Sequence, residues 1–353
     1  MTYNFFIIDT SKSVDQWVNL GILDNFYSLM WSQSFRDEGT FSLITTNSKQ
    51  NVEMLKDNNL IYYVYRNSAM IIQYVKIDDN KNQMEVHGYD ISRFLNYRCI
   101  PFSTFIHNFS NDIENLWLQN LRGSPLNEVA TSNLPYVIDS TIQGNFSDIV
   151  KNWCEIFDIG YKAYVNFESN KLKWELYQGK DLTYKTGKLD SYIFSRENGN
   201  LINIKLLNDS SNLKNVAYVM GTGEGQERTV EIVGDTDIYD SSRVELWIDA
   251  RDIQPDENEG ETANSESYRQ KLRIRGLEKL SEAMIINNIE AEVTGRDFGI
   301  KYNLGDKISA KDSKYNVLLN TRILKYVEYI DEKGQNIKLT FGQPEFNILR
   351  GGI

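Results

Sequence analysis

Two pairs of carboxylates have a spacing that glycoside chemistry could use. Asp249 and Asp252 stand three residues apart beside a strand-like segment, and Glu224 and Glu227 stand three apart in a glycine-rich one. Glycosidases place one carboxylic acid and one carboxylate on either side of the scissile bond. Arg251, however, lies between the first two acids. This order favours a structural ion-pair network at a domain junction over a catalytic pair.

Two further segments only partly match ligand-binding motifs. The glycines of residues 221–225 are followed by the strand-like residues 229–233 and not by a helix. The helix N-terminus that binds phosphate in nucleotide folds is therefore missing, and a hairpin turn is the better interpretation. The acidic loop that begins at Asp235 has Asp240 and Leu246 where a calcium loop needs glycine and glutamate.

Histidine and cysteine are too scarce for imidazole or thiolate chemistry. His87 and His107 have no neighbour at metal-ligand spacing, and Cys99 and Cys154 cannot build a disulfide framework or a four-thiolate zinc site. We therefore predict no cofactor, no metal site and no catalytic residue. A sugar-binding surface of tryptophans stays open as an alternative to core packing, with Trp31, Trp117, Trp153, Trp174 and Trp247 as candidates.

The elements that position these residues are mostly strands. Period-two patterns in the first hundred residues predict strands over 3–9, 28–46 with a turn at 36–39, 60–65, 69–77 and 83–87. A short helix is expected over 51–57. Asp90 is the candidate N-cap of a helix that closes this region, with Ile91, Phe94 and Leu95 on one face.

The rest of the chain predicts a small α+β region and a return to strands. Helices are expected over 111–121 and 146–157, with His107 at the opening of this helical region, and strands over 160–166 and 172–177. The acidic residues 254–261 read as a solvated linker before a long helix over 265–286. Later strands are expected over 203–207, 215–220, 229–233, 244–249, 290–294, 307–310, 318–329 and 336–341.

One pattern occurs twice. Residues 77–83 and 330–336 are polar hairpin tips, each preceded by a long tyrosine-bearing strand and followed by an alternating one. Two hairpins of an Asn- and Lys-rich chain can look alike without common ancestry. The alternative is a duplicated β-barrel.

Composition narrows the class of protein. The chain has 353 residues, of which 38 are Lys or Arg and 49 are Asp or Glu, so its formal charge is −11. Proteins that bind nucleic acid regardless of sequence normally have more Lys and Arg than Asp and Glu, and this chain does not. The sequence has neither a secretory leader nor an apolar run of membrane-spanning length, and we expect a soluble protein made in a cytoplasm.

Five segments in a fixed order resemble the tail hub proteins of long-tailed phages, a family related to the N-terminal hub region of tail-associated lysins. They are residues 35–43, 88–98, 243–253, 302–308 and 338–342. The elements around Glu245, Asp249, Arg251 and Asp252, and around Gly305 and Asp306, carry most of the resemblance.

The resemblance implies a homotrimeric virion structural protein at the tail tip, made in the host cytoplasm. Each subunit of such a hub contributes two similar barrels, so that three chains match a six-fold tail tube. The implied partners are a distal tail protein ring, tape-measure or tail tip proteins, and DNA in transit, with no stable membrane binding. Lysin relatives continue into hydrolytic domains, whereas this sequence stops at Ile353.

We therefore predict a mainly β, α+β fold and no enzymatic activity. The predicted domains are a first barrel (1–98), a small α+β domain (99–197), a second barrel (198–253 and 288–347), and an acidic linker with a long helix (254–287). Glu245, Asp249, Arg251, Asp252, Gly305 and Asp306 are the predicted structural and junction residues. A receptor- or polysaccharide-binding module, or a cell-wall glycosidase using the α+β region, stays open as an alternative.

Overall fold

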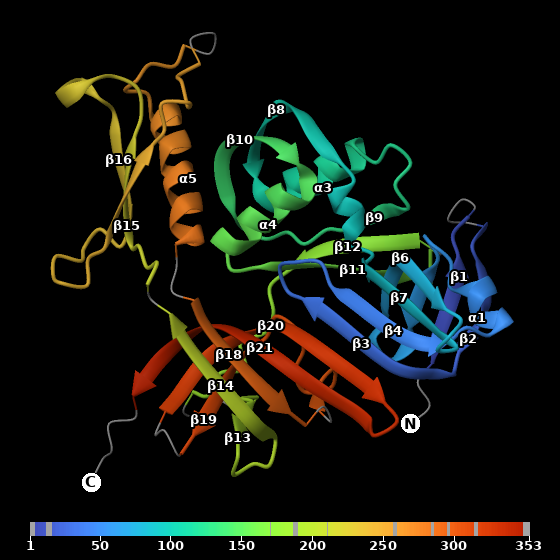
Figure 1. Ribbon diagram of the computed structural model, residues 1–353. Helices are drawn as coiled ribbons and strands as arrows, with labels where there is room; N and C mark the ends of the chain where they lie inside the picture. Colours follow the sequence, from blue (N-terminus) through green and yellow to red (C-terminus); the bar gives the residue numbers. More distant parts are fainter. Residues whose placement is uncertain are drawn as a thin grey trace.

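The computed structural model describes residues 4–11, 16–169, 171–185, 190–209, 211–256, 260–283, 286–294, 297–313 and 317–348. The chain is mainly β, as predicted (Figure 1). Among the described residues, no helix is both long and apolar enough to span a membrane.

The first part of the chain is antiparallel sheet. The predicted turn at 36–39 joins β3 to β4, where Met30 lies opposite Ser42. Helix α1 starts and ends earlier than predicted. Its N-cap is Ser48, whose hydroxyl accepts the Asn51 N–H. The elements are β1 (Phe5–Asp9), β2 (Val18–Leu23), β3 (Phe26–Ser34), β4 (Thr40–Thr46), α1 (Lys49–Met54), β5 (Leu60–Tyr63), η2 (Val64–Arg66), β6 (Ser68–Asp78) and β7 (Gln83–Asp90).

The prediction that Asp90 caps a helix is wrong. Asp90 pairs with Met70 across β6 and β7, so the strand continues through it. Helix α2 (Arg93–Asn96) has Ser92 as its N-cap residue. The Asp90 carboxylate is buried and accepts hydrogen bonds from the Ser92 N–H (2.9 Å) and from Gln33 Nε2 (3.2 Å).

The middle part is an α+β unit that contains more strand than predicted. Both predicted helices are present, each beginning after an asparagine N-cap, Asn108 or Asn145. His107 is near the end of β8, directly before the Asn108 N-cap of α3, and its N–H donates to Asp112 of that helix (2.7 Å), so it does open the helical region. The strand before it, β8, pairs with β10 as a two-stranded ribbon. The elements are β8 (Cys99–Asn108), α3 (Phe109–Gln119), β9 (Leu126–Ala130), β10 (Val137–Asn145), α4 (Phe146–Ile156), β11 (Gly160–Asn166) and β12 (Lys171–Tyr177).

The last part of the chain joins the first in one sheet. Its strands are β13 (Ile193–Ser195), β14 (Leu201–Asp209), β18 (Ile286–Val293), β19 (Lys307–Asp312), β20 (Val317–Asp331) and β21 (Gly334–Ile348). The strand order along the main path is β14-β18-β21-β20-β3-β4-β7-β6-β5-β1-β2. Strand β19 branches from this path: it pairs with the beginning of β20 on one side and with β13 on the other. The long strand β20 crosses from one part to the other, where Tyr329 lies opposite Met30.

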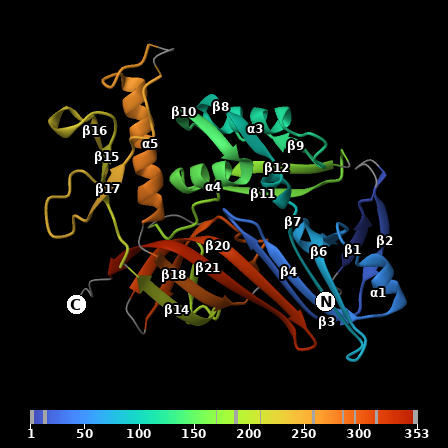
Figure 2. The same ribbon diagram turned by 45° about the horizontal axis from the view of Figure 1, so that its top comes forward.

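The strands predicted over 215–249 do not join this sheet. β15 (Val216–Met220), β16 (Val230–Gly234) and β17 (Glu245–Asp249) form a separate three-stranded sheet, with η3 (Gly225–Glu227) between the first two. Helix α5 (Glu266–Glu282) covers one face of it (Figure 2). The helix ends at Glu282 rather than at 286, because β18 begins at Ile286. The domain division as a whole stays a prediction.

The two polar hairpin tips lie at the same end of the large sheet. Asp331 is opposite Ser28, Ser28 is opposite Ile44, and Ile44 is opposite Glu85, next to the β6–β7 tip. The core on one face of the sheet also crosses between the two parts, because Trp31 and Phe41 belong to the same buried cluster as Tyr326 and Phe341.

The other face of the central strands is open and polar. Opposite the core, Ser42 and Met30 align with Tyr329 across β4, β3 and β20. On the neighbouring strands the exposed Lys76 lies opposite Glu85, and Tyr74 lies opposite His87. The α+β unit covers only part of this face, where Ile71 and Tyr89 pack against its core.

Candidate functional site

The β15–β17 sheet has one covered face and one open face. Ala217, Val219, Val233 and Ile248 point toward α5 and are buried with its Tyr268 and Leu272. Because side chains alternate along a strand, their neighbours point away from the helix. Tyr218 there lies opposite both Ile232 and Trp247, forming one row across three strands. Trp247 is 62% exposed and Ile232 is 44% exposed.

Ion pairs fix this sheet on its helix. The buried Glu231 of β16 accepts hydrogen bonds from Arg269 Nη1 (2.6 Å) and Arg273 Nε (2.8 Å) of α5. Gly276 permits close packing, because a Cβ at this position would lie 2.4 Å from a Val233 methyl carbon. The sheet and helix therefore act as one small unit.

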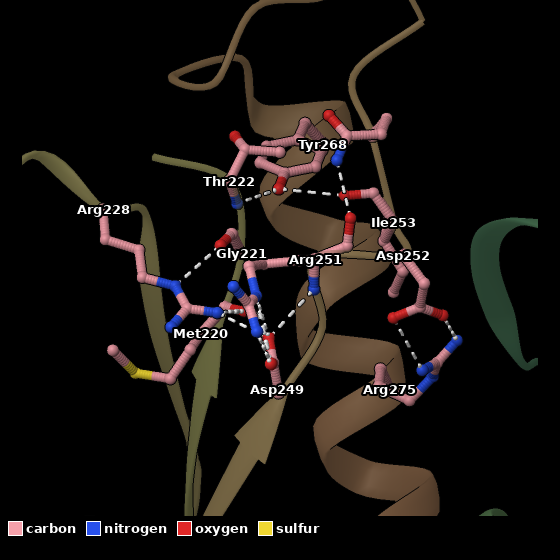
Figure 3. A network of polar contacts seen from close by, with 11 residues as sticks. Met220, Gly221, Thr222, Arg228, Asp249, Arg251, Asp252, Ile253, Tyr268 and Arg275 are labelled. Carbon is pink, nitrogen blue, oxygen red and sulfur yellow. Dashed lines mark hydrogen bonds and ion pairs between the residues drawn. The ribbon is translucent and has the colours of Figure 1, made fainter. Parts of the chain in front are cut away.

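Asp249 is the centre of a polar network at the end of β17 (Figure 3). Its Oδ2 accepts hydrogen bonds from Arg251 Nε (3.0 Å) and Nη2 (2.5 Å), and its Oδ1 accepts one from Arg228 Nη2 (2.6 Å). Arg228 also donates to the carbonyls of Met220 and Gly221. The hydrogen bonds from Arg251, with those from Arg228, hold the pKa of Asp249 well below its usual range.

The residues that follow β17 in the chain contact α5 and so connect the strand to the helix. Asp252 Oδ2 accepts a hydrogen bond from Arg275 Nη2 (3.0 Å). The Tyr268 hydroxyl donates to the Ile253 carbonyl (3.2 Å) and accepts from the Thr222 N–H (2.8 Å). Figure 3 shows both connections beside the Asp249 network.

Glu245 begins β17 with a second ion pair. It accepts a hydrogen bond from Arg243 Nε (2.6 Å), and Arg243 also donates to the Tyr218 hydroxyl (3.1 Å). The Arg228 guanidinium lies 5.9 Å from the Trp247 ring centre. Arg228 and Arg243 thus lie beside the aromatic rings of the open row, and carboxylates fix both arginines there. Four of the six predicted residues, Glu245, Asp249, Arg251 and Asp252, belong to this small unit.

Gly305 and Asp306 lie elsewhere, in the turn before β19. Gly305 has a positive φ of +89°, and a Cβ there would lie 2.5 Å from the Phe35 ring. Asp306 is buried and accepts hydrogen bonds from the N–H groups of Lys180 (2.7 Å) and Asn303 (2.8 Å). Burial raises the pKa of Asp306. No described contact joins this turn to the β15–β17 sheet.

Two ion-pair clusters that the sequence did not indicate join distant parts of the chain. Asp158 of the α+β unit contacts Arg322 Nη2 (2.6 Å), Lys307 Nζ (3.0 Å) and Arg36. The buried Arg66 donates from Nε to the buried Glu328 (2.9 Å). The partners are far apart in sequence, and nothing in their local patterns could have identified them.

A cleft of about 590 Å³ lies where the central strands of the large sheet meet the α+β unit. Tyr65, Asp90, Lys162 and Asp306 are among the residues that line it. Most of its charged groups are already paired, such as Lys162 with Glu175 (2.8 Å). Among the described residues, no three His, Cys, Asp or Glu side chains are placed to hold a metal ion.

Three solved structures with the same fold are tail proteins, two of them from prophages. A tail protein from Neisseria meningitidis MC58 aligns with a TM-score of 0.56 at 11% identity, over 97% of both chains. The 43 kDa tail protein of prophage MuSo2 from Shewanella oneidensis aligns at 0.60 and 12%, over 96% of this chain and 97% of that one. Prophage tail protein gp18 from Listeria monocytogenes EGD-e aligns at 0.54 and 12%, over 96% and 94%.

At the level of sequence, no curated protein matches the chain. A family model described as Siphovirus ReqiPepy6 Gp37-like protein matches residues 7–117 and 117–343, which is nearly the whole chain. The predicted resemblance to phage tail proteins is confirmed. The chain belongs to the Siphovirus ReqiPepy6 Gp37-like family.

Proposed function

We propose that this chain is the hub at the distal end of a phage tail, where three copies form a ring around the DNA channel. The observation that carries the proposal is the continuous sheet, which unites the first and last parts of the chain through β3 and β20. Two sheet regions per chain and three chains supply six modules, which is what a six-fold tube requires of a trimer. Its family and its fold, shared with tail proteins, support this role.

The open polar face is the surface we assign to the channel wall. It carries hydroxyl groups such as those of Ser28, Ser42 and Tyr329, and its exposed Lys76 lies opposite Glu85. Lys325 and Lys338 lie on the same face, on β20 and β21, so the repulsion of the phosphate backbone comes from the acidic chain as a whole. DNA therefore passes through without binding, and the hub closes or gates this passage before ejection.

The two hairpin tips give the ring a single polar rim. Because the tips at residues 79–82 and 332–333 lie at one end of the sheet, a trimer displays six of them on one side. We assign this rim to contacts with a neighbouring ring, such as the distal tail protein, and the other side to tape-measure or tail tip proteins. The chain acts in the virion after synthesis in the host cytoplasm, and its role is structural rather than enzymatic.

Immunogold electron microscopy of intact virions tests the position. Antibody against this chain should label the tail tip, and a phage with the gene disrupted should lack tails with a complete tip. Label on the head or along the tube would contradict the proposal. Turnover of purified cell wall by the isolated chain would instead support the hydrolase alternative.

A further inference from the structure

The open row of the β15–β17 sheet has the composition of a protein interface. Trp247, Ile232 and Tyr218 lie side by side, and the partly exposed Val230 lies on the same face, opposite Met220. Interface centres are enriched in tryptophan, tyrosine and arginine and poor in lysine. Arg228 and Arg243, which flank the aromatic rings, complete that pattern.

The surroundings of this row are strongly acidic. Residues 216–252 hold nine Asp or Glu and only three Arg, against a net charge of −11 for the chain. All three arginines are ion-paired to Asp249 or Glu245. Five exposed carboxylates in the loops at the two ends of the sheet make no ion pair among the described residues: Glu224, Glu227, Asp235, Asp237 and Asp240. A partner for this surface must therefore be apolar at its centre and carry cations at its edge.

The β8–β10 ribbon of the same chain has exposed apolar side chains and two arginines at one end. Its strands contain no Lys or Arg, and the exposed Asp139 of β10 is paired with His107. Phe105 (63% exposed) and Val137 (55%) point away from the face that buries Ile106, and Phe102 (79%) lies at the register shift between Thr104 and Ile100. At the beginning of β8, Arg122 Nη2 donates to the Cys99 carbonyl (3.1 Å), and Arg98 donates to the carbonyls of Tyr97, Leu121 and Arg122. The described partners of both arginines are neutral oxygens, so their charges remain available to carboxylates.

The ribbon cannot reach the open row within one chain. Helix α5 packs against β15 and β16 on one side and against α4 and β10 on the other, so it lies between the two surfaces (Figures 1 and 2). The open row points away from that helix. Contact between the two surfaces therefore requires a second copy.

We propose that the β8–β10 ribbon of one copy docks on the open face of the β15–β17 sheet of the next. The two surfaces are different, so the contact is head-to-tail and repeats from copy to copy until a ring closes. Apolar side chains meet at the centre, while Arg98 and Arg122 meet the unpaired carboxylates of the neighbour. This inference rests on the proposed trimeric hub and assigns the surfaces that close it.

Two double variants of the full chain test the contact by mass photometry at micromolar concentration. Trp247→Ser with Ile232→Ser removes the open row, and Phe102→Ser with Phe105→Ser removes the ribbon surface. All four side chains are exposed, so the melting temperature should stay near that of the parent. Leu118→Ser, at 44% exposure on α3, is the matched control and should remain trimeric.

Each double variant should be monomeric, with association weakened more than about tenfold. Mixed together, the two variants should form dimers and no trimers, because each retains one intact half of the contact. Raising the salt concentration should weaken assembly of the parent. Trimers of either double variant, or no dimers in the mixture, would overturn these surfaces and leave the hub proposal standing. A monomeric parent would overturn the hub trimer itself.

Discussion

At the scale of single residues, buried charges connect parts of the chain that are remote in sequence. Arg66 and Glu328 are 262 residues apart, yet they form a buried ion pair at 2.9 Å, and the Tyr63 hydroxyl also donates to Glu328 (3.0 Å). The sequence indicated Asp249 and Arg251 because they are neighbours along the chain. It could not indicate Glu328, since a lone glutamate in a strand has no local pattern that reveals its partner.

Glu328→Gln should destabilise the fold by about 3–5 kcal/mol, because Arg66 would remain buried without a counter-charge. Chemical unfolding of the purified chain measures this change. Glu53→Gln is the control, since its pair with Lys49 is exposed and should contribute less than about 1 kcal/mol. Equal effects of the two substitutions would contradict the role assigned to Glu328.

Asp90→Asn should stabilise the protein at pH 8. Burial raises the pKa of Asp90 to about 6, so the folded state holds its proton more tightly than the unfolded chain does. Stability from this group is therefore lost as the pH rises from about 4 to about 6. The shift from 3.8 to about 6 corresponds to about 3 kcal/mol at pH 8. Because one carboxylate oxygen becomes an amide nitrogen that cannot accept from Gln33 Nε2, the net gain should be about 2 kcal/mol at pH 8 and little at pH 4. A loss of stability at pH 8, measured by urea unfolding, would refute this account.

Asp249→Ala should leave the melting temperature almost unchanged but reduce assembly. Its partner Arg251 is 66% exposed, so that pair is screened by solvent, and its other partner, Arg228, keeps its hydrogen bonds to the Met220 and Gly221 carbonyls. Asp249 also holds Arg228 beside the Trp247 ring, and removing it frees part of the open row. Arg251→Ala should have a smaller effect on assembly. Thermal unfolding and native mass measurements together check this, and a large fall in melting temperature would show that the network stabilises the fold.

At the scale of elements, the sequence predicted the regular hairpins and missed the irregular ribbon. β4 alternates strictly between buried and partly buried residues, and its pairing with β3 was predicted. β8 and β10 pair with two register shifts, which break the period-two pattern. The separation of β15–β17 from the large sheet was also missed, because strand patterns alone do not specify which strands pair.

Gly305→Ala should destabilise the turn before β19 by about 2 kcal/mol or more. Alanine at φ +89° is strained, and its Cβ would overlap the Phe35 ring. Gly225→Ala separates the two effects, because Gly225 also has a positive φ but no atom within 4 Å of the added Cβ. Unfolding should show the larger loss at Gly305. Equal losses would mean that backbone strain alone explains the glycine.

At the scale of the whole molecule, the two hairpins with the repeated pattern have their tips at the same end of the large sheet. Both tips lie at one end of a sheet that neither part of the chain forms alone, and one buried cluster contains residues from both. The sequence predicted two similar barrels and could not predict that one sheet contains strands of both parts, because the β3–β20 pairing joins residues about 300 positions apart. Whether the two parts superpose as duplicated barrels stays a prediction.

The mass of the purified chain in solution tests the hub most directly. Mass photometry or light scattering at micromolar concentration should give three times 40.9 kDa, about 123 kDa, because a ring of six sheet modules needs three chains. The trimer should be abolished by the Trp247→Ser and Ile232→Ser pair. A stable monomer of 40.9 kDa under these conditions would contradict the trimeric hub.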